Sequence, residues 1–420
     1  MGSTWTRGPS LGRHTLSRLF RSLCHLGWAA TAWVACACGE KSSLASPYWL
    51  PAFTAPMHPS ASATVGDELA GPSFRDQTVR MFVRPTLAGP RLRLVLSNQY
   101  GTQPLQVAAV RVALRTQGVS IDLSTDRQVR FAGATSVSIP PGRTATSEPV
   151  ELAVDGLRDV AVSLHFLARS GAVSWHLEGT RSTAVSGRGD HTGAASFVPA
   201  LTTRSLYFLT ALHVDAAADA SLVVAFGDSI TDGVGTTVDQ ERTWPARLSQ
   251  RLRARGGRAV GVLNAGLSGN RLLEDGYGPS GLRRFERDVL AQRGVKAVIL
   301  LEGINDLGRP GTASGAERIT QAYEQLIQRA RARGMKVYGG TLTPMKGHPY
   351  FTAANEATRE AVNQWIRTPG RFDAVIDFEA ALRDPSDPDA MRAALTVDGL
   401  HPNDAGHALM AEAVDLRLLE

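Results

Sequence analysis

The stretch that decides the fold is Leu222-Val-Val-Ala-Phe226, followed at once by Gly227-Asp-Ser-Ile-Thr-Asp-Gly233. A short apolar run bounded by glycine is typical of a buried strand, and the polar residues after it predict a tight turn. In open α/β sheets, functional groups gather where strands end and loops begin. The sequence therefore predicts that Ser229 is exposed at the carboxyl edge of a sheet.

Further strand-like runs alternate with helix-like runs along the rest of the chain. Strands are expected at 260–264, 297–302, 337–341 and 374–377, and helices near 244–254, 281–292, 316–333, 353–367 and 403–416. This alternation is typical of a doubly wound α/β unit with a mainly parallel sheet. We expect this domain to occupy residues 220–420.

The preceding region has another pattern. Short runs of period two, such as 78–83, 91–96 and 160–166, are bounded by Gly, Pro or Asn. Such spacing indicates an all-β sandwich, which we expect over residues 74–215. Residues 38–73 are rich in Ser, Ala and Pro and are expected to form a tether and an irregular lead-in.

The N-terminus has the composition of an export signal. Residues 1–22 carry four arginines and no acidic residue, and an apolar run follows to residue 37. This run is short for a spanning helix, so residues 1–37 are expected to be a signal peptide of an exported protein, either secreted, periplasmic or lipid-anchored at the cell envelope. The junction Ala37-Cys38-Gly39 resembles a bacterial lipobox, although Ala35 stands where Leu is usual. Two alternatives stay open: lipidation of Cys38 with a membrane tether, or plain cleavage between Ala37 and Ser46.

Composition excludes several function classes. The 420 residues are 43% hydrophobic and 20% charged, which suits two globular domains. Four of the six net positive charges lie in the signal segment, and no basic stripe is interleaved with aromatics, so nucleic acid is not an expected partner. All three cysteines lie in or beside the same segment, which excludes disulfides and thiolate chemistry from the mature domains. Neither a metal nor a cofactor is expected, because four histidines of the β region lack ligand spacing: His165, His176, His191 and His213.

Three other polar loops lie at expected strand or helix ends. They are Asn264-Ala-Gly-Leu-Ser-Gly-Asn270, Gly303-Ile-Asn-Asp306 and Val397-Asp-Gly-Leu-His-Pro402. Together with the turn at Ser229, these loops resemble the four blocks of the GDSL or SGNH hydrolase family, which contribute Ser, Gly, Asn and His in this order. The resemblance covers about residues 222–416 and implies a serine esterase. The β domain resembles the sandwich that precedes the esterase unit in some exported bacterial members.

The chemistry of acyl transfer suggests a role for each of these residues. A serine hydroxyl is a weak nucleophile and needs a base, which His401 can supply to Ser229. Asp398 can accept from the other ring nitrogen and fix the tautomer of His401. The attack creates an oxyanion that needs hydrogen-bond donors. The resemblance implies that these donors are the backbone N–H groups of Ser229 and Gly269 and the side-chain amide of Asn305.

Neighbouring polar residues have structural interpretations. Asp228, Asp232 and Asp306 are expected to hold turns through side-chain to backbone hydrogen bonds. His407 is expected on the surface of the last helix. A G-x-S-x-G match at residues 8–12 is spurious, because it lies in the export signal with no strand before it.

The leading hypothesis is hydrolysis of short-chain carboxylic esters, including acetyl groups on saccharides, through an acyl-serine. The loops 267–281 and 343–352 are mostly Gly, Pro and polar residues and offer no apolar trough for a long acyl chain. Arg271, Glu274 and Asp275 are either sugar-binding residues or ordinary solvated loop residues. Three alternatives remain: an O-acetyltransferase or a lipase on the same triad, or a non-catalytic carbohydrate-binding lipoprotein. The oligomeric state is left open.

Overall fold

The computed structural model describes residues 47–60, 72–308 and 315–420. These residues belong to one compact unit, Pro47–Glu420. The expected signal peptide, Cys38 and the motif at residues 8–12 lie outside the described residues. The expected domain boundaries stay predictions.

A five-stranded parallel sheet forms the C-terminal part, in the order β17-β16-β18-β19-β20. Its strands are β16 (Ser221–Gly227), β17 (Val260–Gly266), β18 (Val295–Leu301), β19 (Lys336–Gly340) and β20 (Ala374–Ile376). Strand β16 lies inside the sheet, with β17 on one side and β18 on the other. This order creates a switch point at the carboxyl end of β16, where open α/β sheets bind their ligands. The expected doubly wound α/β fold is confirmed.

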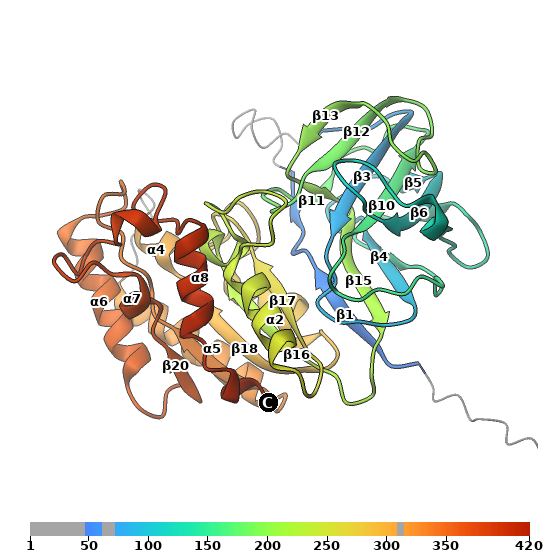
Figure 1. The fold of residues 1–420 in the computed structure, drawn as a ribbon. Coiled ribbons are helices and arrows are strands. Elements are labelled where there is room, and N and C mark those ends of the chain that lie inside the picture. The colour runs from blue at the N-terminus through green and yellow to red at the C-terminus, as the bar shows by residue number, and fades with distance from the viewer. Residues whose placement is uncertain (1–46, 61–71, 309–314) are drawn as a thin grey trace, which may run out of the picture. The chain divides into compact units, whose positions relative to one another are not determined.

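Helices follow the strands in turn (Figure 1). They are α1 (Ser229–Asp232), α2 (Trp244–Arg255), α3 (Gly281–Phe285), α4 (Ile304–Gly308), α5 (Ala316–Arg331), α6 (Ala353–Arg367), α7 (Phe378–Leu382) and α8 (Asp404–Ala413). Helix α3 continues into a π-helical turn, Glu286–Leu290. In α5, buried residues recur at helical spacing, as in Ile319, Tyr323 and Leu326, so the helix packs through one apolar stripe. Within the described residues no helix is both long enough and apolar enough to cross a membrane.

The N-terminal part is all-β, as expected, and its sheets are antiparallel. Two larger sheets have the orders β1-β15-β4-β9 and β13-β12-β3-β10-β6-β7, and two small ones the orders β14-β11-β2 and β5-β8. The strands are β1 (Trp49–Thr54), β2 (His58–Pro59), β3 (Gln77–Val83), β4 (Leu92–Ser97), β5 (Leu105–Val107), β6 (Ala109–Leu114), β7 (Arg127–Gln128), β8 (Val137–Ile139), β9 (Thr144–Thr146), β10 (Val160–Phe166), β11 (Ser174–His176), β12 (Thr183–Arg188), β13 (Pro199–Thr203), β14 (Leu206–Tyr207) and β15 (Leu209–Asp215).

The irregular lead-in expected before residue 74 is wrong in part, because it contains β1 and β2. Strand β1 pairs with β15 and has a register shift between Pro51 and Phe53. It is the last strand of its sheet, where a proline that donates no hydrogen bond is tolerated. Its other side lies beside β17 of the parallel sheet (Figure 1). The sequence pattern did not predict this strand, because prolines are uncommon inside strands.

Candidate active site

Ser229 is the first residue of α1 and follows β16 directly. The turn between them is tight: a Cβ added to Gly227 would lie 2.3 Å from the Leu301 carbonyl oxygen, so only glycine fits. The Asp228 side chain accepts a hydrogen bond from the Ile230 N–H at 3.0 Å, which is the turn-holding role that the sequence suggested. Burial, with help from the charges of Asp306 and Asp232, raises the pKa of Asp228 to about 7.

The structure brings together the three residues expected to form a triad. Ser229 Oγ lies 2.9 Å from His401 Nε2, and His401 Nδ1 lies 2.7 Å from Asp398 Oδ2. Because Asp398 faces Nδ1, that nitrogen carries the proton and leaves Nε2 free to accept one from Ser229. The three side chains therefore form a continuous chain from nucleophile to base to carboxylate.

The short loop that carries His401 is held by Asp398 itself. Asp398 Oδ1 accepts from the backbone N–H groups of Leu400 at 2.9 Å and His401 at 2.7 Å. Partial burial raises the pKa of Asp398, but the hydrogen bonds from the backbone and ring of His401 outweigh it, so the pKa lies below its ordinary value. Asp398 is therefore ionised at neutral pH and orients both the loop and the ring.

The glycine block forms a turn beside Ser229. The Asn270 N–H donates to the Leu267 carbonyl at 3.0 Å, and Gly269, with φ +70°, takes the left-handed position of that turn. Across the part of the chain that the structure describes, the N–H groups of Ser229 and Gly269 have no hydrogen-bond partner. Both donors are thus available to an incoming group.

Asn305 lies in the first turn of α4, after β18, and is 3% exposed. Its Nδ2 donates to the Asn270 carbonyl at 2.9 Å, and its Oδ1 accepts from the Tyr350 hydroxyl at 3.2 Å. A carbonyl only accepts, so this contact fixes which side of the amide carries the nitrogen. The second Nδ2 hydrogen remains for an oxyanion. Tyr350 was not singled out from the sequence, because nothing local marks it as a partner of Asn305.

Arg284 is a buried residue that the sequence did not reveal. Its side chain has no exposed surface, and it donates to the Gly227 carbonyl at 2.7 Å, the Ala265 carbonyl at 2.8 Å and Asn270 Oδ1 at 2.6 Å. It also pairs with Asp288 and Glu302, each at 3.2 Å. One guanidinium thus ties together the ends of β16 and β17 and the glycine block. A lone Arg in a helix gives no sequence signal for this role.

Two acidic groups lie beneath the site. Asp306 accepts from the backbone of Leu272 at 2.7 Å and of Leu273 at 3.0 Å, and burial raises its pKa to about 6. Burial and the charge of Asp228 raise the pKa of Glu302 well above its ordinary value. Asp306 therefore organises the loop after Asn270, in agreement with the structural role expected for it.

One of two expectations for single polar residues is wrong. His407 is fully buried, and its Nδ1 accepts from the Trp244 N–H at 3.1 Å, because α8 packs against α2 on that side. Burial lowers its pKa to about 4, so it is neutral. Asp232 holds a turn as expected, because its carboxylate accepts from the Ser268 backbone N–H and hydroxyl, and it also contacts His176.

The loop residues for which two interpretations were open contact one another. Arg271 donates to Glu274 at 3.3 Å and to the Asp275 carbonyl, and Asp275 also pairs with Arg283. These contacts favour the structural interpretation of Arg271 and Asp275.

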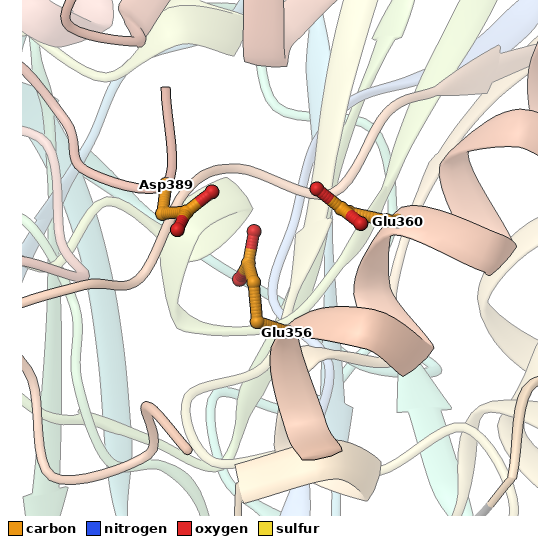
Figure 2. A group of neighbouring side chains, drawn as sticks. All are labelled: Glu356, Glu360 and Asp389. Atoms are coloured by element: carbon orange, nitrogen blue, oxygen red, sulfur yellow. The ribbon is translucent and has the colours of Figure 1, made fainter. Parts of the chain in front are cut away.

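Two other features do not include Ser229, His401 or Asp398. A cavity of about 90 Å³ is lined by both His176 and Asp232, but its lining does not include Ser229 or His401. Figure 2 shows the carboxylates of Glu356, Glu360 and Asp389, which lie within 4.8 Å of one another. Glu356 is paired with the buried Arg359, which balances its charge.

Comparison with known proteins agrees with this geometry. Residues 225–409 match the GDSL-like Lipase/Acylhydrolase family, so this part of the chain is a GDSL-like hydrolase domain and the protein is an ester-bond hydrolase. The resemblance of the C-terminal part to GDSL hydrolases, stated from the sequence, is confirmed. No curated protein matches the chain.

Similar solved structures include three hydrolases. A putative lipolytic protein of the G-D-S-L family from Desulfitobacterium hafniense DCB-2 is 23% identical, over 46% of this chain and 97% of its own, with a TM-score of 0.37. The lipase/acylhydrolase from Enterococcus faecalis is 22% identical, over 46% and 92%, with a TM-score of 0.38. Est24, a carbohydrate acetylesterase from Sinorhizobium meliloti, is 16% identical, over 47% and 98%, with a TM-score of 0.38.

Proposed function

We propose that the protein is an exported serine esterase that hydrolyses short-chain carboxylic esters through an acyl-serine intermediate. The observation that carries the proposal is the hydrogen-bonded chain from Ser229 through His401 to Asp398, beside two unoccupied N–H donors. This arrangement meets the requirements of acyl transfer: an activated hydroxyl, an oriented base and donors for an oxyanion.

In the proposed mechanism, His401 Nε2 takes the proton of Ser229 as Oγ attacks the ester carbonyl. The imidazolium is stabilised by ionised Asp398. The N–H groups of Ser229 and Gly269 and the Asn305 amide bind the oxyanion of the tetrahedral intermediate. His401 then returns the proton to the leaving alcohol, which yields the acyl-serine. Water, deprotonated by His401, attacks the acyl-serine. His401 then returns this proton to Ser229 Oγ as the acyl bond breaks, which releases the acid and regenerates Ser229 and neutral His401.

The walls of the site support a small acyl group. Leu272 is fully buried, and Leu273, Tyr350 and Phe351 are each partly covered, so these residues leave little free apolar surface. Each methylene of a long acyl chain contributes about 0.8 kcal/mol to binding only where it is buried against free apolar surface. Residues 309–314, which follow α4 directly, lie outside the described residues.

Export is part of the proposal and is supported by the arginine-then-apolar N-terminus. If Cys38 is lipidated, the enzyme is tethered at the cell envelope; if cleavage is plain, it is released.

The test is ester hydrolysis by the purified enzyme and its variants. Ser229→Ala and His401→Ala should each lower kcat for p-nitrophenyl acetate by more than about 10³-fold, with the double variant scarcely worse, because the two residues act as a unit. Circular dichroism should show unchanged folding. Near-normal hydrolysis by Ser229→Ala would refute the mechanism. Comparing free acid release with acylation of an added alcohol separates hydrolysis from acyl transfer.

A further inference from the structure

His176 ends β11 in the β-sandwich, yet its ring reaches the hydrolase domain. His176 Nε2 lies 2.9 Å from Asp232 Oδ1, and Asp232 ends the short helix that begins at Ser229. The two residues are 5% and 4% exposed, so the contact is both direct and buried. The β-sandwich therefore contributes a polar contact one helical turn behind the nucleophile.

The contact continues from Asp232 to the glycine block. Asp232 Oδ2 accepts from the Ser268 backbone N–H at 3.0 Å and from the Ser268 hydroxyl at 2.6 Å. Ser268 directly precedes Gly269, whose N–H is one of the two unoccupied donors. The Ser268 N–H belongs to the Leu267–Ser268 peptide plane, so these two hydrogen bonds hold that plane and the Ser268 side chain. The Gly269 N–H lies in the next peptide plane, which is joined to the first at the Cα of Ser268.

The geometry also sets the protonation of His176. Its Nδ1 lies 3.1 Å from the Pro56 carbonyl, which only accepts, while its Nε2 faces a carboxylate. A neutral imidazole carries a single N–H, so both contacts are satisfied only when both nitrogens are protonated. Burial lowers the pKa of His176, but the charge and hydrogen bond of Asp232 outweigh it and raise the pKa above its ordinary value.

The neighbouring His58 is consistent with a charged His176. Its Nε2 accepts from the Leu177 N–H at 3.2 Å, as a neutral ring does. Burial first, and then the charge of His176, lower the pKa of His58 to about 3. One charged and one neutral histidine thus lie side by side, and the charged one faces Asp232.

We propose that His176 is a positioning residue of the esterase site, which as an imidazolium holds Asp232 and, through Asp232, the Ser268–Gly269 turn that presents an oxyanion donor. This inference rests on the proposed function. If His176 acts in this way, the β-sandwich is a structural part of the proposed catalytic site, whether or not it also binds a ligand.

The kinetic test compares His176→Leu, which removes both donors, with His176→Gln, which keeps one N–H toward Asp232. We expect His176→Leu to lower kcat by about 10-fold or more and to change KM by less than about twofold, because an oxyanion donor acts mainly in the transition state. His176→Gln should lie between His176→Leu and the unmodified enzyme. His213→Gln is the control, since His213 lies elsewhere in the sandwich, on β15, and its charged neighbour is Arg93.

A second measurement is independent of turnover. Amide hydrogen exchange of a peptide spanning residues 266–270 should be faster in His176→Leu than in the unmodified protein and unchanged in His213→Gln, since Ser268 is released. Unchanged exchange and unchanged kcat in a folded His176→Leu would overturn the proposal. If His176→Leu does not fold, His176→Gln, which keeps one N–H, carries the test with the same two readouts, and values equal to those of the unmodified protein in both would overturn the proposal. Full activity in Ser229→Ala would refute the proposed function but not the role of the His176–Asp232 contact. The exchange measurement would still test that contact.

Discussion

Replacing Arg284 by Lys should destabilise the protein strongly, although the charge is kept. The guanidinium makes five contacts, with Asn270, Ala265, Gly227, Asp288 and Glu302. A Lys ammonium has three donors on one atom, so at least two of the five contacts are lost. Hydrogen bonds to charged groups contribute about 1.5–3 kcal/mol each, which gives a loss of roughly 3–6 kcal/mol.

Urea unfolding followed by circular dichroism measures this loss as a change in the free energy of unfolding. The matched control is Arg283→Lys at the next residue, whose side chain is 69% exposed and pairs with Asp275. A surface pair contributes about 0–1 kcal/mol, so this control should remain close to the unmodified protein. An Arg284→Lys protein within about 1 kcal/mol of the unmodified one would contradict the structural role given to Arg284.

Four further results are expected. Asn305→Ala should lower kcat by about 10²–10³-fold with little change in KM, as expected for an oxyanion donor, and an effect confined to KM would remove it from that role. Burial raises the pKa of Asp228 from 3.8 to about 7, so the stability given by its protonated form is present below about pH 3.8 and is lost as the pH rises toward 7. Between pH 4 and 8, the free energy of unfolding of Asp228→Asn should therefore fall less than that of the unmodified protein. Equal pH slopes of the two proteins in urea titrations would contradict this. Across p-nitrophenyl esters, kcat/KM should peak between acetyl and butyryl, whereas a maximum at dodecanoyl or beyond would indicate a lipase. Intact mass of membrane-extracted protein should show a processed N-terminus: a lipid on Cys38 supports the tether, an unmodified N-terminus beyond Cys38 excludes it, and a retained Met1 excludes processing.

Some expectations from the sequence failed at residues whose surroundings come from distant segments. His407 has the spacing of a helix-surface residue, but the face of α8 that carries it packs against α2 and buries it. The prolines around β1 argued against a strand, yet the edge of the β15 sheet accepts one. The local sequence pattern describes one segment by itself, whereas the burial of its residues depends on which other elements pack against that segment.

The sequence by itself determined the parallel α/β sheet and the grouping of Ser229, Gly269, Asn305, Asp398 and His401. Apolar runs alternating with helical ones predict parallel strands, and the loops at their carboxyl ends meet at one edge of the sheet, so short motifs along the chain become neighbours. Spacing alone also brought Asp398 to His401, because only two residues of one loop separate them.

Only the tertiary structure decided what holds that group in place. Arg284 and His176 have no motif, and each acts through partners that the fold brings to it from other strands and loops. A single buried charge is stable only where several acceptors converge on it, and this convergence depends on how the strands, loops and helices pack together. The proximity of the candidate catalytic residues could therefore be predicted from local sequence, but the residues that hold them in place could not.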